Sequence, residues 1–364
     1  MQLNPTLAWL IDAAAETPAA EEFLASLGRR LIEDGAPLAG GALTLAAPHP
    51  LIARRTWLWR AETGEVSEAL GFLPGALAPA GAANPPGEAG RRWLAGLGPG
   101  EAHEDAVAPK PHGPTLAWIG RRPFTADEAE RLSEAARFAA APLAALTARA
   151  TLTAALEAYL GRRSAARVLA GPLRRGVGET IQAALMFADL RGFTALSESN
   201  SPSAVIAALD AWFDRIALSV HAFGGEVLKF MGDGVLAIFP VAGATPRGAC
   251  DAALSAVAAA RAGMAHLDEA RRREGLAPLP FGVALHLGEI LWGNIGAADR
   301  LDFTAIGPAV NLVSRLEGLC RPLGKEALIS GAFAAEATAA LVPLGEHALR
   351  GIASPCAVFT VAGD

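Results

Sequence analysis

Two aspartates stand where apolar segments end, in surroundings that suit metal-assisted chemistry. Asp189 closes an apolar run within residues 184–194, Ala-Leu-Met-Phe-Ala-Asp-Leu-Arg-Gly-Phe-Thr, and Asp233 lies within residues 229–234, Lys-Phe-Met-Gly-Asp-Gly. The first run is typical of a strand that passes directly into a helix, and the second of a hairpin tip. Carboxylates on neighbouring strands can hold two divalent cations that promote phosphoryl chemistry. The pair therefore predicts a two-metal site.

The helix start that follows Asp189 is expected to bind phosphate. Backbone N–H groups of residues 191–194 are predicted to be unpaired at the positive end of that helix, facing the β and γ phosphates of a nucleotide. Gly192 allows a close approach of the backbone, and Phe193 and Thr194 follow it directly. These three residues are candidate substrate-binding residues.

Lys229 precedes Asp233 by four residues, and its neighbours Leu228, Phe230 and Met231 are all apolar. One interpretation is an exposed lysine on a strand. The other is a strand buried on both faces, in which the ammonium group needs an acceptor such as a purine ring nitrogen. The second interpretation makes Lys229 a candidate base-reading residue.

A further polar pair follows in residues 304–317, Thr-Ala-Ile-Gly-Pro-Ala-Val-Asn-Leu-Val-Ser-Arg-Leu-Glu. Asn311 and Arg315 are four residues apart on a predicted helix and therefore share one face. An amide and a fixed cation aimed at one point suit a ribose and a developing phosphoryl charge. Taken alone, the pair could equally be a surface feature.

The elements that must position these residues follow a βαββαβ order from residue 180 onward. A strand over 182–189 is followed by a helix that begins at Ser201-Pro202, the 225–239 hairpin, and a helix that begins at Thr245-Pro246. A second hairpin is expected from strands over 281–286 and 289–295, linked by Leu287-Gly288. This order predicts an α+β fold with a ferredoxin-like antiparallel sheet and helices on one face.

Residues 1–150 are expected to form a separate mixed α/β domain. The expected elements are a helix over 7–25 broken near Pro18, strands over 42–46, 56–60 and 115–119, a loop over 73–90, and a helix capped by Thr125 and Glu128 and kinked or split at Pro142. This pattern resembles GAF or PAS domains and implies a sensor or dimerisation role. Its tryptophans suit core packing, with a ligand pocket as the alternative.

Residues 151–179 are predicted to be a helical linker between this domain and the domain at 180–362. The linker is rich in arginine, which indicates either a solvated helix face or a regulatory anion site. Phe138 to Ala148, the best membrane candidate, is too short to span and contains Pro142. With no secretory signal at the start, we expect a cytoplasmic protein without a membrane span.

Composition narrows the class of partner. The 364-residue chain has a formal net charge of −6 and no long basic run, which argues against nucleic acid as the main partner. Cys250, Cys320 and Cys356 are far apart and match no metal or redox spacing, as expected of small core residues in a reducing compartment.

The three motifs together resemble the catalytic domain of class III nucleotidyl cyclases, over roughly residues 180–362. They are Phe-Ala-Asp-Leu-Arg-Gly-Phe-Thr, Gly-Gly-Glu-Val-Leu-Lys-Phe-Met-Gly-Asp-Gly and Ile-Gly-Pro-Ala-Val-Asn-Leu-Val-Ser-Arg-Leu-Glu. The resemblance implies that Asp189 and Asp233 bind two Mg²⁺ or Mn²⁺ ions, with the carbonyl of Leu190 assisting one of them.

The resemblance also implies roles toward the nucleotide. Lys229 and Thr304 fall where the family reads the purine, Asn311 where the ribose is oriented, and Arg315 where the transition-state charge is met. Arg350 stands where family members often have a phosphate-contacting lysine, and Arg preserves the charge but changes the geometry. Pro308 stands where related sequences often have Asp, and we expect only a mild effect on the turn.

The purine positions indicate the substrate. Guanylate cyclases of this family typically have Glu and Cys where this chain has Lys229 and Thr304, so the adenylate type is predicted. Thr in place of the common Asp resembles the subgroup of bicarbonate-responsive soluble cyclases, which makes bicarbonate a candidate for the small regulator. The implied reaction converts ATP to 3′,5′-cyclic AMP and pyrophosphate at two equivalent sites in a homodimer, under the control of residues 1–150.

Four other classes compete with this prediction. A guanylate cyclase and a catalytically silent nucleotide-binding regulator share the fold, although silent members usually lose a metal acid or the arginine. A polymerase palm should show a basic nucleic-acid path. A diguanylate cyclase needs a Gly-Gly-Asp-Glu-Phe type of hairpin, which the segment Met231-Gly232-Asp233-Gly234 does not match.

Overall fold

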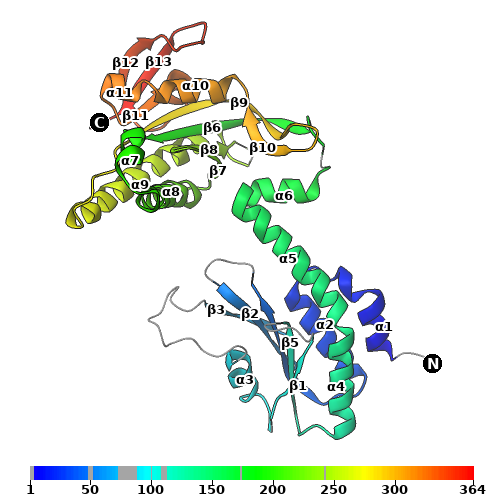
Figure 1. Ribbon diagram of the computed structural model, residues 1–364. Coiled ribbons are helices and arrows are strands. Elements are labelled where there is room, and N and C mark those ends of the chain that lie inside the picture. The colour runs from blue at the N-terminus through cyan, green and yellow to red at the C-terminus, as the bar shows by residue number, and fades with distance from the viewer. Residues whose placement is uncertain are drawn as a thin grey trace. The chain divides into compact units, whose positions relative to one another are not determined.

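The structure is a computed structural model that describes residues 4–47, 52–72, 88–99, 101–107, 113–172, 174–241 and 243–364. The chain divides into two compact units, Met1–Ala155 and Leu156–Asp364 (Figure 1). Each unit has its own buried apolar core, so each is described by itself.

The first unit is a five-stranded antiparallel sheet in the order β3-β2-β1-β5-β4, with helices on both faces (Figure 1). Helices α1, α2 and α4 bury one face, and α3 covers the other. The GAF or PAS resemblance stays a prediction. The elements are α1 (Pro5–Asp12), a 3-10 turn η1 (Ala14–Glu16), α2 (Ala20–Glu33), β1 (Leu38–Ala46), β2 (Ile52–Arg60), β3 (Val66–Phe72), α3 (Glu88–Leu94), β4 (His103–Ala106), β5 (Thr115–Gly120), α4 (Ala126–Phe138) and α5 (Ala140–Leu160), which crosses into the second unit.

Local signals in this unit act as expected. Thr125 Oγ1 accepts from the Glu128 amide at 3.3 Å, and the Glu128 carboxylate accepts from the Thr125 amide at 2.9 Å, which completes the capping box of α4. The long helix splits at Ala139, just before Pro142, since proline is tolerated only in the first turn of a helix. Of the predicted loop over 73–90, residues 73–87 lie outside the described part of the chain, and residues 88–90 begin α3 instead.

No single helix in the described part of the chain is long and apolar enough to cross a membrane. Helices α4 and α5, which meet at 44°, reach that length and composition only as a bent pair.

The second unit is built on an eight-stranded sheet in which β12-β13-β11-β9-β6-β8-β7 are neighbours and β10 pairs with β9. Strands β7-β8-β6-β9 and helices α8 and α9 confirm the ferredoxin-like βαββαβ order. The elements are α6 (Arg162–Ala170), β6 (Gly178–Leu190), α7 (Phe193–Ser199), α8 (Pro202–Ala222), β7 (Glu226–Met231), β8 (Gly234–Pro240), α9 (Pro246–Arg273), β9 (Phe281–Gly296), β10 (Leu301–Ile306), α10 (Pro308–Glu317), α11 (Cys320–Leu323), β11 (Ala327–Ser330), α12 (Gly331–Ala334), β12 (Leu341–His347) and β13 (Cys356–Val361).

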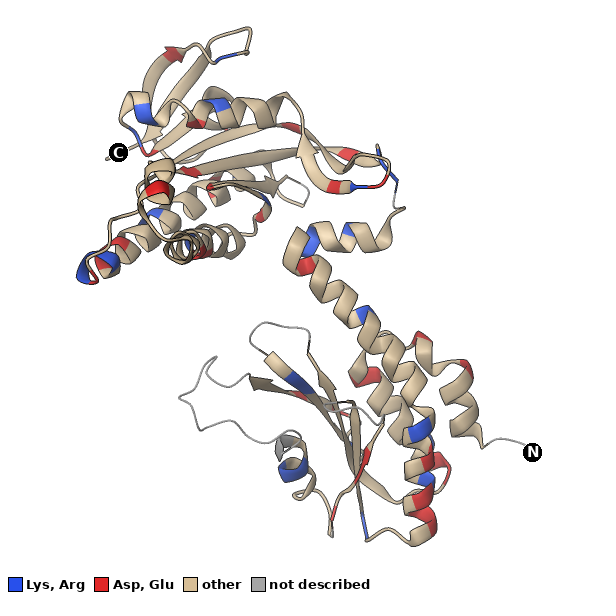
Figure 2. Cartoon of the chain, viewed as in Figure 1, with Lys and Arg blue, Asp and Glu red and all other residues tan. Residues whose placement is uncertain are grey.

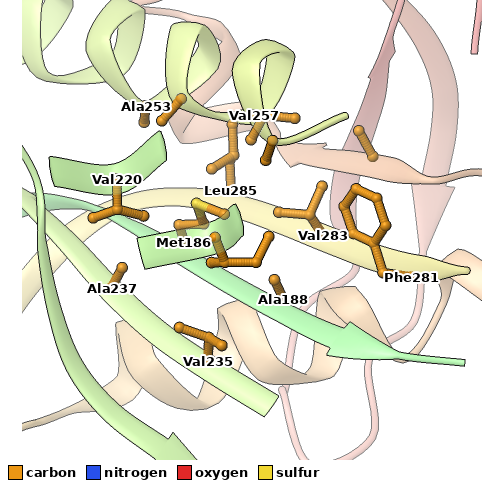
Figure 3. Packing of buried hydrophobic residues seen from close by; sticks show 14 of the residues in the cluster. Met186, Ala188, Val220, Val235, Ala237, Ala253, Val257, Phe281, Val283 and Leu285 are labelled. Carbon is orange, nitrogen blue, oxygen red and sulfur yellow. The ribbon is translucent and has the colours of Figure 1, made fainter. Parts of the chain in front are cut away.

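Two expectations for this sheet are wrong. Helices cover both faces, because β6 is apolar on both: Met186 and Ala188 face α8 and α9 (Figure 3), whereas Ala183 and Leu185 pack under α10. The sheet is also not wholly antiparallel, since β11 runs parallel to β9.

The predicted hairpin at Leu287-Gly288 is wrong as well. Strand β9 runs without interruption from Phe281 to Gly296, and Gly288 pairs with Ala183 in the middle of β6. A Cβ on Gly288 would lie 2.6 Å from the Cβ of Ala309, so this glycine makes room for α10 rather than for a turn. The hairpin at this place joins β9 to β10 instead.

Acidic and basic residues are interspersed along the helices (Figure 2), and ion pairs join some of them. In the arginine-rich linker, Arg167 pairs with Glu179 and lies over the ring of Trp292, 4.5 Å from its centroid. At the end of α9, Arg273 pairs with Glu269. At least this linker arginine is therefore held by the protein itself, which disfavours its use in an anion site.

Candidate active site

The structure brings the two predicted metal acids together. Strand β6 pairs with β8, and the register Ala188 to Val235 places Asp189 beside the turn that carries Asp233. A Cβ on Gly234 would lie 3.2 Å from Asp189 Oδ1, so the turn approaches the first acid closely. Leu190 follows Asp189 as the last residue of β6, paired with Phe281. The site therefore lies at the end of two neighbouring strands of the sheet.

The second carboxyl group makes ionisation of the first less favourable. Burial raises the pKa of Asp189 to about 6, and the charge of Asp233 and a hydrogen bond between the two carboxyl groups add to this increase. Burial also raises the pKa of Asp233. A divalent cation would relieve this repulsion, and carboxylate and carbonyl oxygens suit Mg²⁺ or Mn²⁺. The residues present therefore fit such an ion.

A third carboxyl group lies beside the pair and was missed in the sequence. A Cβ on Gly282, which pairs with Asp189, would lie 2.5 Å from Glu317 Oε1. Burial, together with the charges of Asp189 and Asp233 and against that of Arg191, raises the pKa of Glu317 to about 7. In the described part of the chain no group of three or more His, Cys, Asp or Glu residues is arranged to hold a metal, so we assign Glu317 no ligand role.

Trp212 connects the helix layer to the second metal acid. Its indole Nε1 donates to the backbone oxygen of Asp233 at 2.9 Å, and its ring is fully buried against Phe281. No role at this site was predicted for Trp212 from the sequence. Because the hydrogen bond reaches the turn itself, Trp212 is a positioning residue for the carboxylate of Asp233.

Trp212→Phe is expected to weaken Mn²⁺ binding about three- to tenfold, the size of one neutral hydrogen bond, because the hairpin tip loses its support. Trp292→Phe is the matched control: Trp292 Nε1 is also buried but has no hydrogen-bond partner among the described residues. Titration of Mn²⁺ by electron paramagnetic resonance measures both affinities. Equal losses in the two variants would show that Trp212 acts only by filling the core.

The affinity for Mn²⁺ is expected to fall as the pH drops through about 6, by about tenfold per unit, because a proton competes for Asp189. The pKa of Asp189 is higher in the folded protein than in the unfolded chain, so protonated Asp189 stabilises the metal-free folded state. This contribution to the free energy of unfolding is lost as the pH rises through about 6. Mn²⁺ titrations between pH 5 and 8 test this. Asp189→Asn should bind weakly with little pH dependence, and equal wild-type affinity at both ends of the range would contradict the prediction.

The predicted phosphate segment is present, with one correction. Gly192 has φ +78° and precedes α7. No described atom lies within 4 Å of where its Cβ would be, so the glycine serves the left-handed backbone. The Arg191 amide was predicted to be unpaired, but it donates to the Pro280 oxygen at 2.7 Å. Phe193 packs partly against the core, and Thr194 is exposed. The candidate donors are reduced to those of Gly192, Phe193 and Thr194.

Lys229 has a partner in its own chain that the sequence analysis did not identify, Asp302 on β10, with which it forms an ion pair. The strand is not buried on both faces, since Phe230 and Met231 are 49% and 42% exposed. The reason is that β7 is an edge strand. Asp302 and Thr304 alternate onto one face of β10, so the structure brings Lys229 toward the buried Thr304.

Asn311 and Arg315 are both exposed on α10, which begins at Pro308 as expected from the motif. Arg350 is exposed in the connection between β12 and β13. Within the described residues, no hydrogen bond or ion pair of the single chain joins these three side chains to Asp189 or Asp233. The chain therefore contains two separate groups of candidate residues.

Residues 177–326 match the family model of the adenylate and guanylate cyclase catalytic domain. The chain carries a class III cyclase catalytic domain. The match covers all three motifs and ends shortly before β11, which leaves Arg350 outside it.

Several curated relatives are adenylate cyclases. Over 180 residues the chain is 34% identical to adenylate cyclase 1 of Rhizobium meliloti, covering 49% of this chain and 27% of the relative. It is 30% identical over 159 residues to the adenylate cyclase of Anabaena cylindrica, and 30% identical over 211 residues to adenylate cyclase 2 of R. meliloti. The alignments cover 43% and 56% of this chain, and 30% and 55% of those relatives.

Part of the chain is similar to solved cyclase structures. A bacterial light-regulated adenylyl cyclase superposes with a TM-score of 0.51 at 27% identity, over 60% of this chain and 62% of that one. The adenylyl cyclase CyaB from P. aeruginosa gives a TM-score of 0.47 at 29% identity, over 52% of this chain and 97% of that one.

Proposed function

We propose that the protein is an adenylate cyclase that converts ATP to 3′,5′-cyclic AMP and pyrophosphate. The observation that carries the proposal is the pair Asp189 and Asp233, held together at the ends of β6 and the β7–β8 turn of a class III cyclase domain. The adenylate cyclases among its relatives support ATP as the substrate.

Mg²⁺ or Mn²⁺, when bound, supplies Lewis acidity toward the ribose 3′-hydroxyl and the triphosphate. The chain's own residues hold and orient the reactants. Asp189, Asp233 and the carbonyl of Leu190 hold the two ions. The amides of Gly192, Phe193 and Thr194 hold phosphate oxygens at the start of α7, and Arg350 contributes a further positive charge.

Two other residues act at the reacting centre. Asn311 orients the ribose so that its 3′-oxygen faces the α-phosphorus, which converts binding energy into alignment. Arg315 donates to the phosphoryl oxygens as negative charge develops on them, and its guanidinium geometry suits that role. No side-chain nucleophile takes part, so the chemistry depends on positioning and on charge stabilisation.

Lys229 and Thr304 select adenine. Adenine N1 accepts from the Lys229 ammonium group, and its N6 amino group donates to the Thr304 hydroxyl. The ion pair with Asp302 holds Lys229 near Thr304 before ATP arrives. Thr304 resembles the residue that bicarbonate-responsive soluble cyclases have at this position, which supports bicarbonate as the candidate regulator.

The active site is completed by a second copy of the chain. The acid pair belongs to one protomer, and Lys229, Thr304, Asn311 and Arg315 belong to the other, which gives two equivalent sites by two-fold symmetry. Exposed apolar side chains near the second group suit such an interface, among them Phe230, Met231 and Ile306. Residues 1–150 act as a sensor or dimerisation domain whose signal passes through the linker at 151–179.

The test is a product assay on the full chain with ATP or GTP and Mn²⁺, in which cyclic AMP and cyclic GMP are separated by chromatography. Cyclic AMP from ATP, with little cyclic GMP from GTP, is expected. Preferential formation of cyclic GMP would indicate guanylate instead of adenylate specificity. If neither product forms although the protein binds ATP, the protein would be a silent regulator.

A further inference from the structure

A buried carboxylate joins the linker to the strand that carries Lys229. Glu226, the first residue of β7, is only 3% exposed, and its Oε1 accepts from the Ser164 amide at 2.9 Å and from the Ser164 hydroxyl at 2.6 Å. Ser164 is fully buried in the first turn of α6. Two hydrogen bonds to one oxygen therefore fix the start of α6 to the start of β7.

The backbone around this contact is shaped to admit the carboxylate. Gly161 precedes α6 with φ +81°, and a Cβ there would lie 3.0 Å from Glu226 Oε1. The unpaired amides and the positive end of the α6 dipole favour a negative charge at this point. A larger residue at 161 would be strained and would also push against the carboxylate.

The contact leaves one buried carboxylate oxygen without a hydrogen bond to any described residue. Glu226 Oε2 is buried and has no hydrogen-bond partner in the described part of the chain. An unfilled acceptor on a buried carboxylate opposes folding, and an apolar residue would avoid that cost. A carboxylate at this place is therefore better explained by what it positions than by stability.

The strand that Glu226 anchors has an irregularity just before Lys229. Val227 pairs with Ala237, but Lys229 already pairs with Leu236, so Leu228 is an extra residue in a β-bulge. A bulge bends the strand and sets the direction of the side chains that follow it. The Ser164–Glu226 contact fixes β7 before the bulge. Lys229 follows the bulge, so the direction of its side chain depends on how the strand is held there.

We propose that Ser164 and Glu226 are positioning residues for purine recognition, which hold β7 so that Lys229 meets adenine N1. The proposal rests on the purine-reading role of Lys229 given above. Because α6 lies in the linker, any displacement of that helix changes the affinity for ATP through Glu226 while the metal acids stay in place. A change in the linker can therefore alter recognition of the adenine base without altering the metal site.

The experiment compares ATP with 1-deaza-ATP, which lacks the N1 acceptor, in calorimetric binding to the full chain. The wild type is expected to bind ATP about tenfold more tightly, the value of a charged hydrogen bond, and Ser164→Ala to reduce this ratio to about threefold by weakening ATP binding alone. Gly161→Ala should lower the ratio in the same way. Ser219→Ala removes another buried hydroxyl, on α8, and should leave it unchanged.

Three outcomes are distinguishable. If Lys229→Ala leaves the ratio at its wild-type value, the purine-reading role is wrong and the proposal fails with it. If Lys229→Ala abolishes the ratio but Ser164→Ala and Gly161→Ala do not change it, only the positioning proposal fails. Equal weakening of both nucleotides in Ser164→Ala would show a merely structural role.

Amide exchange gives a second measurement that does not depend on nucleotide binding. The Ser164 amide donates to Glu226, so Glu226→Gln, which keeps the shape of the side chain but removes its charge, is expected to raise the exchange rate of that amide about tenfold. The Ser219 amide, within α8, serves as the reference. An unchanged Ser164 rate would show that the carboxylate does not hold the helix and would overturn the proposal.

Discussion

Asp189→Ala and Arg315→Ala proteins are each expected to lose at least about a thousandfold in cyclic AMP formation, because each removes a group that meets charge in the transition state. An equimolar mixture of the two is expected to recover about a quarter of the wild-type rate. Half of the dimers are then mixed, and each mixed dimer retains one of its two sites. A standard cyclase assay on the mixed and unmixed proteins measures the recovery.

The separation of the two residue groups within one chain is the reason for this expectation. Asn311 and Arg315 are exposed on α10 and form no hydrogen bond or ion pair with Asp189 or Asp233 in the described structure. The matched control mixes Asp189→Ala with Asp233→Ala. Both changes fall in the same half of the site, so every site in that mixture is damaged and no activity should return. Recovery in both mixtures, or in neither despite confirmed mixed dimers, would contradict a shared site.

Features that depend on neighbouring residues were predictable from the sequence. Ser201 Oγ accepts from the Ala204 amide at 3.3 Å, and Thr245 Oγ1 accepts from the Gly248 amide at 3.0 Å, as their Ser-Pro and Thr-Pro signals indicate. The two-residue turn at Asp233 follows equally from its flanking glycines. Helix caps and tight turns depend on only a few consecutive residues, so they can be predicted from the sequence alone.

Features that depend on distant partners were not predictable. Gly288 looks like a turn residue until Ala309, which belongs to a later helix, is seen to occupy the space beside it. Lys229 appeared to need a purine nitrogen as acceptor, because its partner Asp302 lies on a strand 73 residues away in sequence. The same holds for Glu317, whose carboxyl group meets Asp189 only through the pairing of β6 with β9. In each case the missing information is which element packs alongside.

Changing Lys229 and Thr304 together to the guanylate-type residues, Lys229→Glu with Thr304→Cys, is expected to reduce kcat/KM for ATP by about a hundredfold or more. A carboxylate at 229 accepts where adenine N1 also accepts, and an unpaired polar group in a base pocket costs this much. For GTP the same carboxylate matches the N1–H and N2 donors of guanine. The reversal of specificity is expected to be incomplete, however. In the wild type Asp302 pairs with Lys229, so in the variant the new carboxylate at 229 would lie beside the carboxylate of Asp302.

A third change, Asp302→Asn, should therefore complete the exchange by removing the like-charge repulsion at the base pocket. The kcat/KM for GTP is expected to rise about tenfold from the double to the triple variant, and mainly through a lower KM, since Asp302 lies beside the proposed base-reading residue Lys229. The control is Asp302→Asn alone, which leaves Lys229 and Thr304 in place, so ATP should remain the preferred substrate. If the double variant already uses GTP as well as the triple variant does, the contact between Lys229 and Asp302 has no part in base selection.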